Sequence, residues 1–466
     1  MSALSTSPPD TGRSLGWSLA LLALAQLIFS LDLNIVFVAL PEIGAELGFP
    51  NQTQQWVVGA YAVFAGGFLL LGGRAADLFG RRRMFVAALA VYAASSLAGG
   101  LATGPGLIIA ARMVQGIGGA MLLPSTLSLI NTLFEEGPRR NRALAVWGGA
   151  GASGLTVGAL LGGILTEFFG WPAVFYVNVP LAGLVAVAAL VVIPRDAAAQ
   201  RGRRFDVPGA LTVTGGATLL VYALVQGAEV GWGATDVVVA AALAVVLLVA
   251  FAFIEVRSAD PLMPPRLLRN RSLVVGVSAT FVYMGTFGAL PYFLTILFQQ
   301  VHGFSALQTG LGFLLPALAI AAGTQLGERA ATRFGTRATL VAGGVIGVVG
   351  TAILAVGFQD GAGYLVAVPG LLVSGVGQGI TWTAMWIAAG SGVAAGEQGV
   401  ASGMASTTLN LGNAIGIAAL TAVAYSGHSA ETAVLAGGGR LAVLLAAVGM
   451  VLGVLLAFAL PRKEIR

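Results

Sequence analysis

Long apolar runs dominate the chain, and short arginine-rich segments separate most of them. A helix that crosses a bilayer needs about 20 mostly apolar residues. Runs of this kind occur at 15–40, 56–73, 84–102, 105–130, 143–166, 172–193, 208–227, 236–256, 272–298, 306–326, 338–357, 362–389, 399–424 and 440–460. The sequence therefore predicts an all-α integral membrane protein with 14 transmembrane helices.

The composition disfavours the water-soluble classes of protein. Of the 466 residues, 57% are hydrophobic and 9% are charged, whereas a soluble domain carries about 25% charged residues. A soluble enzyme and a nucleic-acid-binding domain lack support for this reason. The chain has no cysteine and only two histidines, so we expect no disulfide, no metal site and no cofactor.

The basic residues predict the orientation of the spans, because cytoplasmic loops carry an excess of Lys and Arg. With a cytoplasmic N-terminus, all but two of the 24 basic residues fall in cytoplasmic segments, and the exceptions are Arg112 and Arg440. Both termini are therefore expected in the cytoplasm. The pI of 9.9 then reflects loops beside anionic lipid and not a nucleic-acid partner. Abundant Ala, Gly and Arg with a single Lys indicate a bacterial inner-membrane protein.

The spans are predicted to form two pseudo-symmetric six-helix bundles with two extra helices between them. The predicted parts are a disordered cytoplasmic tail (1–14), an N-terminal bundle (15–193), cytoplasmic linkers with the extra helices (194–271), a C-terminal bundle (272–460) and a second tail (461–466). A weak repeat supports this division, because residues 73–82 (GRAADLFGRR) and 327–337 (GERAATRFGTR) follow the second span of each half. Internal repeats of this kind build the midplane cavities of transporters.

Asp32 is the one acidic residue, among 19, that falls well inside a predicted span. A carboxylate at the bilayer centre costs about 2.5–3.5 kcal/mol on insertion scales, and intramembrane acids usually mark ion paths. Burial favours the protonated form, so such a group is able to exchange a proton near neutral pH. Asp32 is therefore predicted to couple transport to protons. A structural hydrogen bond to a neighbouring helix is the alternative.

Arg112 is a cation in the fourth predicted span. Helical spacing puts Arg112, Gln115, Gly116 and Gly119 on one face, which is polar and small enough for a close approach of another helix. Two roles for Arg112 remain open. It either holds the fold by pairing with a carbonyl group or tunes the proton affinity of a carboxylate.

Small residues form a ladder in the fifth predicted span. Gly154, Gly158 and Gly162 recur at four-residue spacing, and Gly163 follows them. Ladders of small residues let two helix backbones approach closely. The pattern indicates either static packing or a contact along which helices move, and the residues alone leave both interpretations open.

Polar and aromatic side chains recur at helical spacing in the later spans. Apolar walls with a few placed polar groups are typical of sites for amphiphilic molecules. The predicted substrate-binding residues, which include two from the early spans, are Asn34, Gln115, Tyr283, Phe287, Tyr292, Gln378, Trp382, Trp386, Asn410 and Asn413. Packing between helices and aromatic anchoring at the membrane interface are the alternatives.

Three motifs resemble signatures of the major facilitator superfamily, in its branch of fourteen-helix drug:proton antiporters. Residues 73–82 are similar to the cytoplasmic loop signature, residues 32–41 (DLNIVFVALP) to the first-helix signature and residues 112–119 (RMVQGIGG) to the fourth-helix signature. The fifth-helix signature of exporters has a proline where this chain has Ala159. This departure weakens any argument from a proline kink.

The resemblance implies roles for particular residues. Asp77 would cap a helix and pair across the bundles, while Arg81 and Arg82, with the glycines Gly73 and Gly80 of the same motif, would hold the inward-closed state. Asp32 and Arg112 would handle protons.

The expected function is export of lipophilic or cationic drug-like small molecules by alternating access, driven by the proton gradient. The expected partners are substrate, protons and the lipid bilayer, and the chain is expected to act as a monomer. A transporter of lipids or an endogenous metabolite with the same fold is the alternative. A membrane enzyme is disfavoured, because the sequence lacks a P-loop, paired carboxylates and a histidine cluster.

Overall fold

The computed structural model describes residues 11–49, 56–195, 206–258, 261, 263–304, 306–359, 362–424 and 437–461. Within these ranges the regular elements are all helices. The predicted tails at 1–10 and 462–466, and most of the predicted connection 194–207, lie outside the described residues. The predicted disordered tail is wrong for residues 11–14, because the first helix begins at Thr11.

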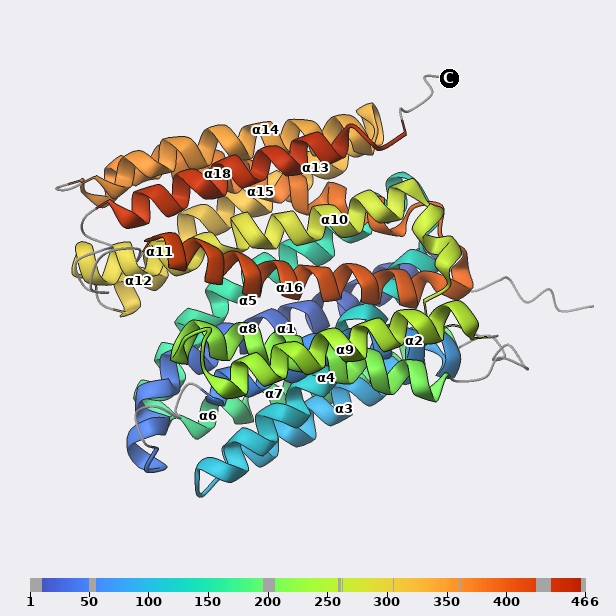
Figure 1. The fold of residues 1–466 in the computed structure, drawn as a ribbon, viewed down its shortest axis with the longest axis horizontal. Coiled ribbons are helices and arrows are strands. Elements are labelled where there is room, and N and C mark those ends of the chain that lie inside the picture. The colour runs from blue at the N-terminus through green and yellow to red at the C-terminus, as the bar shows by residue number, and fades with distance from the viewer. Residues whose placement is uncertain are drawn as a thin grey trace, which may run out of the picture.

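The first seven helices pack together as one group, which is blue to green and lies in the lower part of Figure 1. They are α1 (Thr11–Glu46), α2 (Trp56–Phe79), α3 (Arg81–Gly100), α4 (Pro105–Leu133), α5 (Pro138–Phe169), α6 (Pro172–Tyr176) and α7 (Asn178–Val192). We call them the N-terminal group. The predicted sixth span is divided between α6 and α7, with a turn at Val177.

The last helices form a second group, which is yellow to red and lies in the upper part of Figure 1. They are α10 (Arg271–Thr286), α11 (Leu290–Ile296), α12 (Ala306–Gly312), α13 (Leu314–Phe334), α14 (Thr336–Leu354), α15 (Tyr364–Gly390), α16 (Gln398–Ala424) and α18 (Gly438–Ala457), with the short helices η1 (Pro265–Arg269), η2 (Phe287–Ala289), η3 (Leu297–Val301), η4 (Ala355–Phe358) and η5 (Ala395–Glu397) between them. We call them the C-terminal group. The predicted span 272–298 is not one regular helix, since η2 interrupts it one turn before Pro291. Proline removes a backbone donor and favours such a break.

The pair α8 (Val207–Val230) and α9 (Thr235–Arg257) lies in front of the N-terminal group in Figure 1, next to α16. α8 packs closely on α2, where a Cβ atom at Gly67 would lie 2.9 Å from the Cα atom of Thr218. The rings of Trp56 and Tyr222 stack between the same two helices, with centroids 5.6 Å apart. The pair is therefore attached to the N-terminal group through α2.

Twelve helices in the described part of the chain are long and apolar enough to cross a membrane. Helices also occupy the two other predicted spans, namely α5 with 32 residues and α16 with 27, but these two are not among the twelve. Both helices are rich in glycine and polar residues. They pack against neighbours in both groups.

The predicted connection between the second and third spans, residues 74–83, is almost entirely helical. α2 continues to Phe79 and α3 begins at Arg81, so Gly80 alone separates them. Its φ of +100° lies in the left-handed region that favours glycine. Gly335, in the repeated segment 327–337, also has a positive φ, of +86°, and joins α13 to α14 in the same way. The charged residues that ended the predicted span are tolerated in α2 because the helix end lies against other helices.

Candidate functional site

Asp32 lies near the middle of α1 and is fully buried inside the N-terminal group. Its Oδ2 atom accepts a hydrogen bond from Arg112 Nη1 at 2.7 Å. Its Oδ1 atom accepts from Gln115 Nε2 at 3.0 Å and from Asn178 Nδ2 at 2.8 Å. The carboxylate is thus held by side chains of α4 and α7, far from water.

Arg112 contacts both a backbone carbonyl group and the carboxylate of Asp32. Its Nε atom donates to the carbonyl oxygen of Val57 at 2.9 Å, and Nη1 also donates to Gln115 Oε1 at 2.8 Å. The guanidinium lies 4.4 Å from the centre of the Tyr61 ring. Arg112 therefore both ties α4 to α2 and neutralises the carboxylate of Asp32.

The described hydrogen bonds to the Asp32 carboxylate all come from N–H donors. An ionised carboxylate only accepts hydrogen bonds, whereas a protonated one must also donate one. The network therefore fits the deprotonated form of Asp32. A buried ion pair is costly when one partner is removed, by about 3–5 kcal/mol, so a change in the protonation of Asp32 would alter the packing around Arg112.

The glycine ladder of α5 packs against the segment of α1 that carries Asp32. A Cβ atom at Gly154, Gly158 or Gly162 would lie 2.6, 2.4 or 2.9 Å from the carbonyl oxygen of Leu27, Leu31 or Ile35, respectively. These separations leave no room for a larger residue unless the helices move apart. Gly163 has no atom within 4 Å of such a Cβ, so it does not belong to the ladder. The side chain of Ala159 lies outside the described residues.

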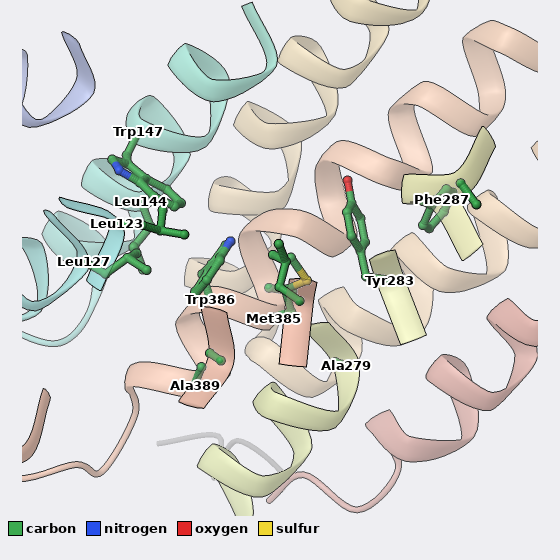
Figure 2. Close-up of a cluster of buried hydrophobic side chains, with 14 of the residues drawn as sticks. Leu123, Leu127, Leu144, Trp147, Ala279, Tyr283, Phe287, Met385, Trp386 and Ala389 are labelled. Carbon is green, nitrogen blue, oxygen red and sulfur yellow. The ribbon is translucent and has the colours of Figure 1, made fainter. Parts of the chain in front are cut away.

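A cluster of aromatic rings joins the two groups. Trp147 of α5 stacks on Trp382 of α15 at 6.1 Å between centroids and meets Trp386 edge-on at 5.5 Å. Tyr283 of α10 lies 5.4 Å from Trp382 and 5.2 Å from Phe287. Figure 2 shows Trp147 facing Trp386, with Tyr283 and Phe287 beyond them. We call these five residues the aromatic cluster.

The cluster offers ring faces and polar atoms to a ligand. The indole Nε1 atoms of Trp147, Trp382 and Trp386 are buried and have no hydrogen-bond partner in the described structure. Indole N–H groups only donate. Ring faces also attract cations. These are the chemical groups that would contact a flat aromatic or cationic molecule with acceptor atoms.

The two groups also meet at the end of the molecule where α10 and α16 begin, which is the right-hand end in Figure 1. Asp77 of α2 accepts hydrogen bonds from the backbone N–H groups of Gly399 (3.1 Å) and Val400 (3.0 Å) at the start of α16. A carboxylate is stabilised at a helix N-terminus by its unpaired N–H groups and the helix dipole. We call this end, where Asp77 and Arg81 meet the start of α16, the Arg-rich end.

Further contacts close the Arg-rich end. Arg81 forms an ion pair with Asp77 at 3.2 Å and donates to the carbonyl oxygen of Ala395. Gly73 lies against the backbone of Gly399, where a Cβ atom would be 2.3 Å from its carbonyl oxygen. Arg82 instead donates to the carbonyl oxygen of Leu190 within the N-terminal group. The groups are therefore in close contact at this end.

The predicted substrate-binding residues do not form one site. Gln115 belongs to the Asp32 network, whereas Tyr283, Phe287, Trp382 and Trp386 belong to the aromatic cluster. Near that cluster, Gln378 Nε2 lies 3.5 Å from the carbonyl oxygen of Phe287.

The remaining predictions are more scattered. Asn413 lies close to Gly288 in the interrupted helix, and its Oδ1 atom has no partner in the described structure. Asn410 bonds to the backbone of its own helix at Ser406. Tyr292 is 39% exposed on α11 and packs on Phe293. Asn34 is partly buried, and helical spacing places it on the opposite side of α1 from Asp32.

Sequence reasoning missed Asn178 and Trp147. Asn178 is the first residue of α7, and no charge or spacing in its own segment distinguishes it. Trp147 lies three turns into α5, where one tryptophan is equally compatible with membrane anchoring. Only the packing of α5 and α7 against other helices reveals what these side chains contact.

Comparison with known proteins decides the family. Residues 22–417 match the profile of the Major Facilitator Superfamily. The chain belongs to this family. It is 39% identical to the cephamycin export protein CmcT of Amycolatopsis lactamdurans over 91% of this chain and 89% of the relative. It is 38% identical to the puromycin resistance protein pur8 of Streptomyces alboniger over 91% and 84%, respectively.

Solved structures show the same superfamily fold. The proton:xylose symporter XylE matches with a TM-score of 0.70 and 14% identity over 97% of both chains. The human organic anion transporter MFSD10 matches with a TM-score of 0.67 and 18% identity over 97% of this chain and 100% of that one. The chain is therefore a multi-pass membrane transporter with the fold of its family.

Proposed function

We propose that this transporter exports lipophilic or cationic drug-like molecules in exchange for protons. The similarity to a cephamycin exporter and a puromycin resistance protein supports the cargo, since it extends over nine-tenths of the chain at 38–39% identity. The observation that carries the coupling is the buried Asp32–Arg112 pair, in which a carboxyl group inside a membrane-spanning helix lies 2.7 Å from a guanidinium nitrogen.

Proton binding and substrate binding then take place at separate positions. Asp32 and Arg112 lie inside the N-terminal group, whereas the aromatic cluster lies between the two groups. Proton uptake by Asp32 would weaken its pairing with Arg112 and repack α1 against α4. The glycine ladder would pass this change to α5, which carries Trp147 of the aromatic cluster. A ligand shifts such an equilibrium only through its different affinity for the two states.

The proposed topology has 14 spans with both termini in the cytoplasm, in a bacterial inner membrane, and a monomer as the working unit. α5 and α16, with 32 and 27 residues, are each long enough to cross the hydrocarbon core of about 30 Å at 1.5 Å per residue. The Arg-rich end would face the cytoplasm. Two six-helix bundles and the α8–α9 pair complete the proposed arrangement, and the contacts at the Arg-rich end would close it toward the cytoplasm.

Transport by the purified protein in proteoliposomes tests the proposal. We expect an imposed pH gradient to drive uphill movement of ethidium or puromycin, and a protonophore to abolish it. Liposomes without protein are the control. Equal transport with and without the gradient would refute proton coupling, and movement of lipid probes alone would favour a lipid carrier.

The aromatic cluster gives a prediction about affinity. Trp382→Ala removes the ring that contacts Trp147, Trp386 and Tyr283. If the ring also stacks on the substrate, its loss removes about 0.5–1.5 kcal/mol of binding free energy beyond the buried area, so the ethidium concentration for half-maximal transport should rise up to about tenfold. Trp17→Ala, at a position that is 60% exposed, is the matched control. Unchanged half-saturation in Trp382→Ala would remove the cluster from the substrate site.

A further inference from the structure

We propose that the side-chain amide of Asn178 rotates when Asp32 is protonated, and that this residue thereby senses the protonation state of the coupling site. The inference rests on the proposed function, since it concerns the proton that would drive export. In this role Asn178 is a positioning residue, because it acts on the substrate through Asp32 and the packing of α7.

The hydrogen bonds of Asp32 create the need for such a residue. Oδ1 accepts from Gln115 and Asn178, and Oδ2 accepts from Arg112. A proton added to Oδ1 turns this atom into a donor that faces two other donors. The protonated carboxyl group is therefore stable only where a neighbour offers an acceptor.

Asn178 is the neighbour with an unused acceptor. It is fully buried, its Nδ2 atom lies 2.8 Å from Asp32 Oδ1, and its own Oδ1 atom has no hydrogen-bond partner in the described structure. Rotation of the amide by about 180° exchanges its oxygen and nitrogen. The asparagine oxygen would then accept the new proton from Asp32 in place of the 2.8 Å bond that Nδ2 donates now, and Nδ2 would also give up a long contact of 3.5 Å to the carbonyl oxygen of Val174.

Gln115 is not free to respond in this way. Its Nε2 atom donates to both Asp32 and Ser96, and its Oε1 atom accepts from Arg112. Rotation of this amide would break three good hydrogen bonds and turn its N–H groups toward the arginine. Of the two amides that contact Asp32, only Asn178 is able to rotate at low cost.

Three other titratable or charged side chains face Asp32. Arg112 projects from α4, Tyr61 from α2 and Tyr92 from α3. Arg112 has no acceptor atom. The hydroxyl group of Tyr92 interacts with both Asp32 and Tyr61, so it is a second candidate acceptor beside the carboxylate. We assign the role to Asn178 because its amide already forms a 2.8 Å hydrogen bond with Asp32 Oδ1, and Tyr92→Phe is the comparison that separates the two candidates.

The pH profile of ethidium exchange in proteoliposomes tests the inference. Asn178→Leu removes a charge-assisted hydrogen bond from the ionised form of Asp32 and a neutral hydrogen bond from its protonated form. Because the first is about twice as strong as the second, the ionised form is destabilised more, and the half-maximal pH should rise by at least about 0.5 unit. Asn178→Gln, which keeps an amide, should restore much of the wild-type profile. Gln26→Leu removes another buried amide of the N-terminal group, one that bonds to Ser30, and should leave the midpoint unchanged.

Infrared difference spectra of the purified protein in lipid provide a second readout that needs no transport. In wild-type protein with ¹³C-labelled asparagine, acidification should produce the carboxyl band of Asp32 together with a shift of an asparagine C=O band. Both changes should be absent in Asp32→Asn. A carboxyl band without any asparagine shift would overturn the inference even if Asn178→Leu fails to fold.

The outcomes separate the inference from the function on which it rests. Wild-type exchange that does not depend on pH would contradict proton coupling itself. A wild-type profile that depends on pH, with the same midpoint in Asn178→Leu, would reject only the role of Asn178. A midpoint that moves in Tyr92→Phe but not in Asn178→Leu would give that role to the tyrosine.

Discussion

Asp32→Asn is expected to abolish uphill export driven by a pH gradient, while downhill exchange of the same compound continues. Asparagine has nearly the shape of aspartate but cannot exchange a proton in this range. Without proton binding, the pH gradient no longer changes the relative free energies of the substrate-binding states, so coupling is lost. The measurement is ethidium transport in proteoliposomes, with and without an imposed gradient.

The variant needs a control for stability, because it leaves Arg112 buried without its partner. Removal of one member of a buried ion pair costs about 3–5 kcal/mol. The double variant Asp32→Asn/Arg112→Gln removes both charges and should recover much of the thermal stability of the purified protein. It should remain uncoupled. Full gradient-driven transport in either variant would show that Asp32 is not the coupling residue.

The importance of Asp32 was predictable from sequence because the free-energy cost of placing a carboxylate in a membrane depends on the residues next to it in the chain. A carboxylate in the middle of an apolar run has few outcomes, and each requires a partner. That Arg112 is the partner was not predictable, since the pairing depends on how α1 packs against α4. Arg112 also donates a hydrogen bond to the backbone carbonyl oxygen of Val57 in α2, and the residue types do not indicate which carbonyl group it contacts.

The positions of helices were easier to predict than their ends. The predicted second span stops at residue 73 because Arg74 and Asp77 follow, yet α2 continues to Phe79. Charged residues normally end a span when they face water or lipid, but Asp77 here faces the N-terminus of α16. The partner that makes the charge tolerable lies more than 300 residues away.

In the double variant Asn141→Cys/Thr332→Cys, a cross-link between the two introduced thiols is expected to stop transport completely, and a reducing agent should restore transport. Asn141 lies in the first turn of α5 and Thr332 lies near the end of α13. Their side chains are joined by a hydrogen bond of 3.2 Å at the Arg-rich end. The chain has no cysteine, so a short reducible thiol cross-linker would react only with the introduced pair. Single-cysteine variants treated with the same reagent should keep their activity.

The matched control is a disulfide that does not join the two groups. A Cβ atom at Gly66 would lie 3.8 Å from the Cβ atom of Val221, which is the usual separation in disulfides. Because α8 packs on α2, Gly66→Cys/Val221→Cys should form a disulfide and still transport ethidium.

Both bridges restrict a helix, but only the first prevents the groups from separating at the Arg-rich end. Alternating access requires this end to open, since Asp77, Arg81 and the aromatic cluster close it in this structure. If the Asn141–Thr332 bridge left transport intact, substrate would have to cross while these contacts persist. Rocking of one group against the other would then be excluded as the mechanism, and passage would have to depend on movements within each group.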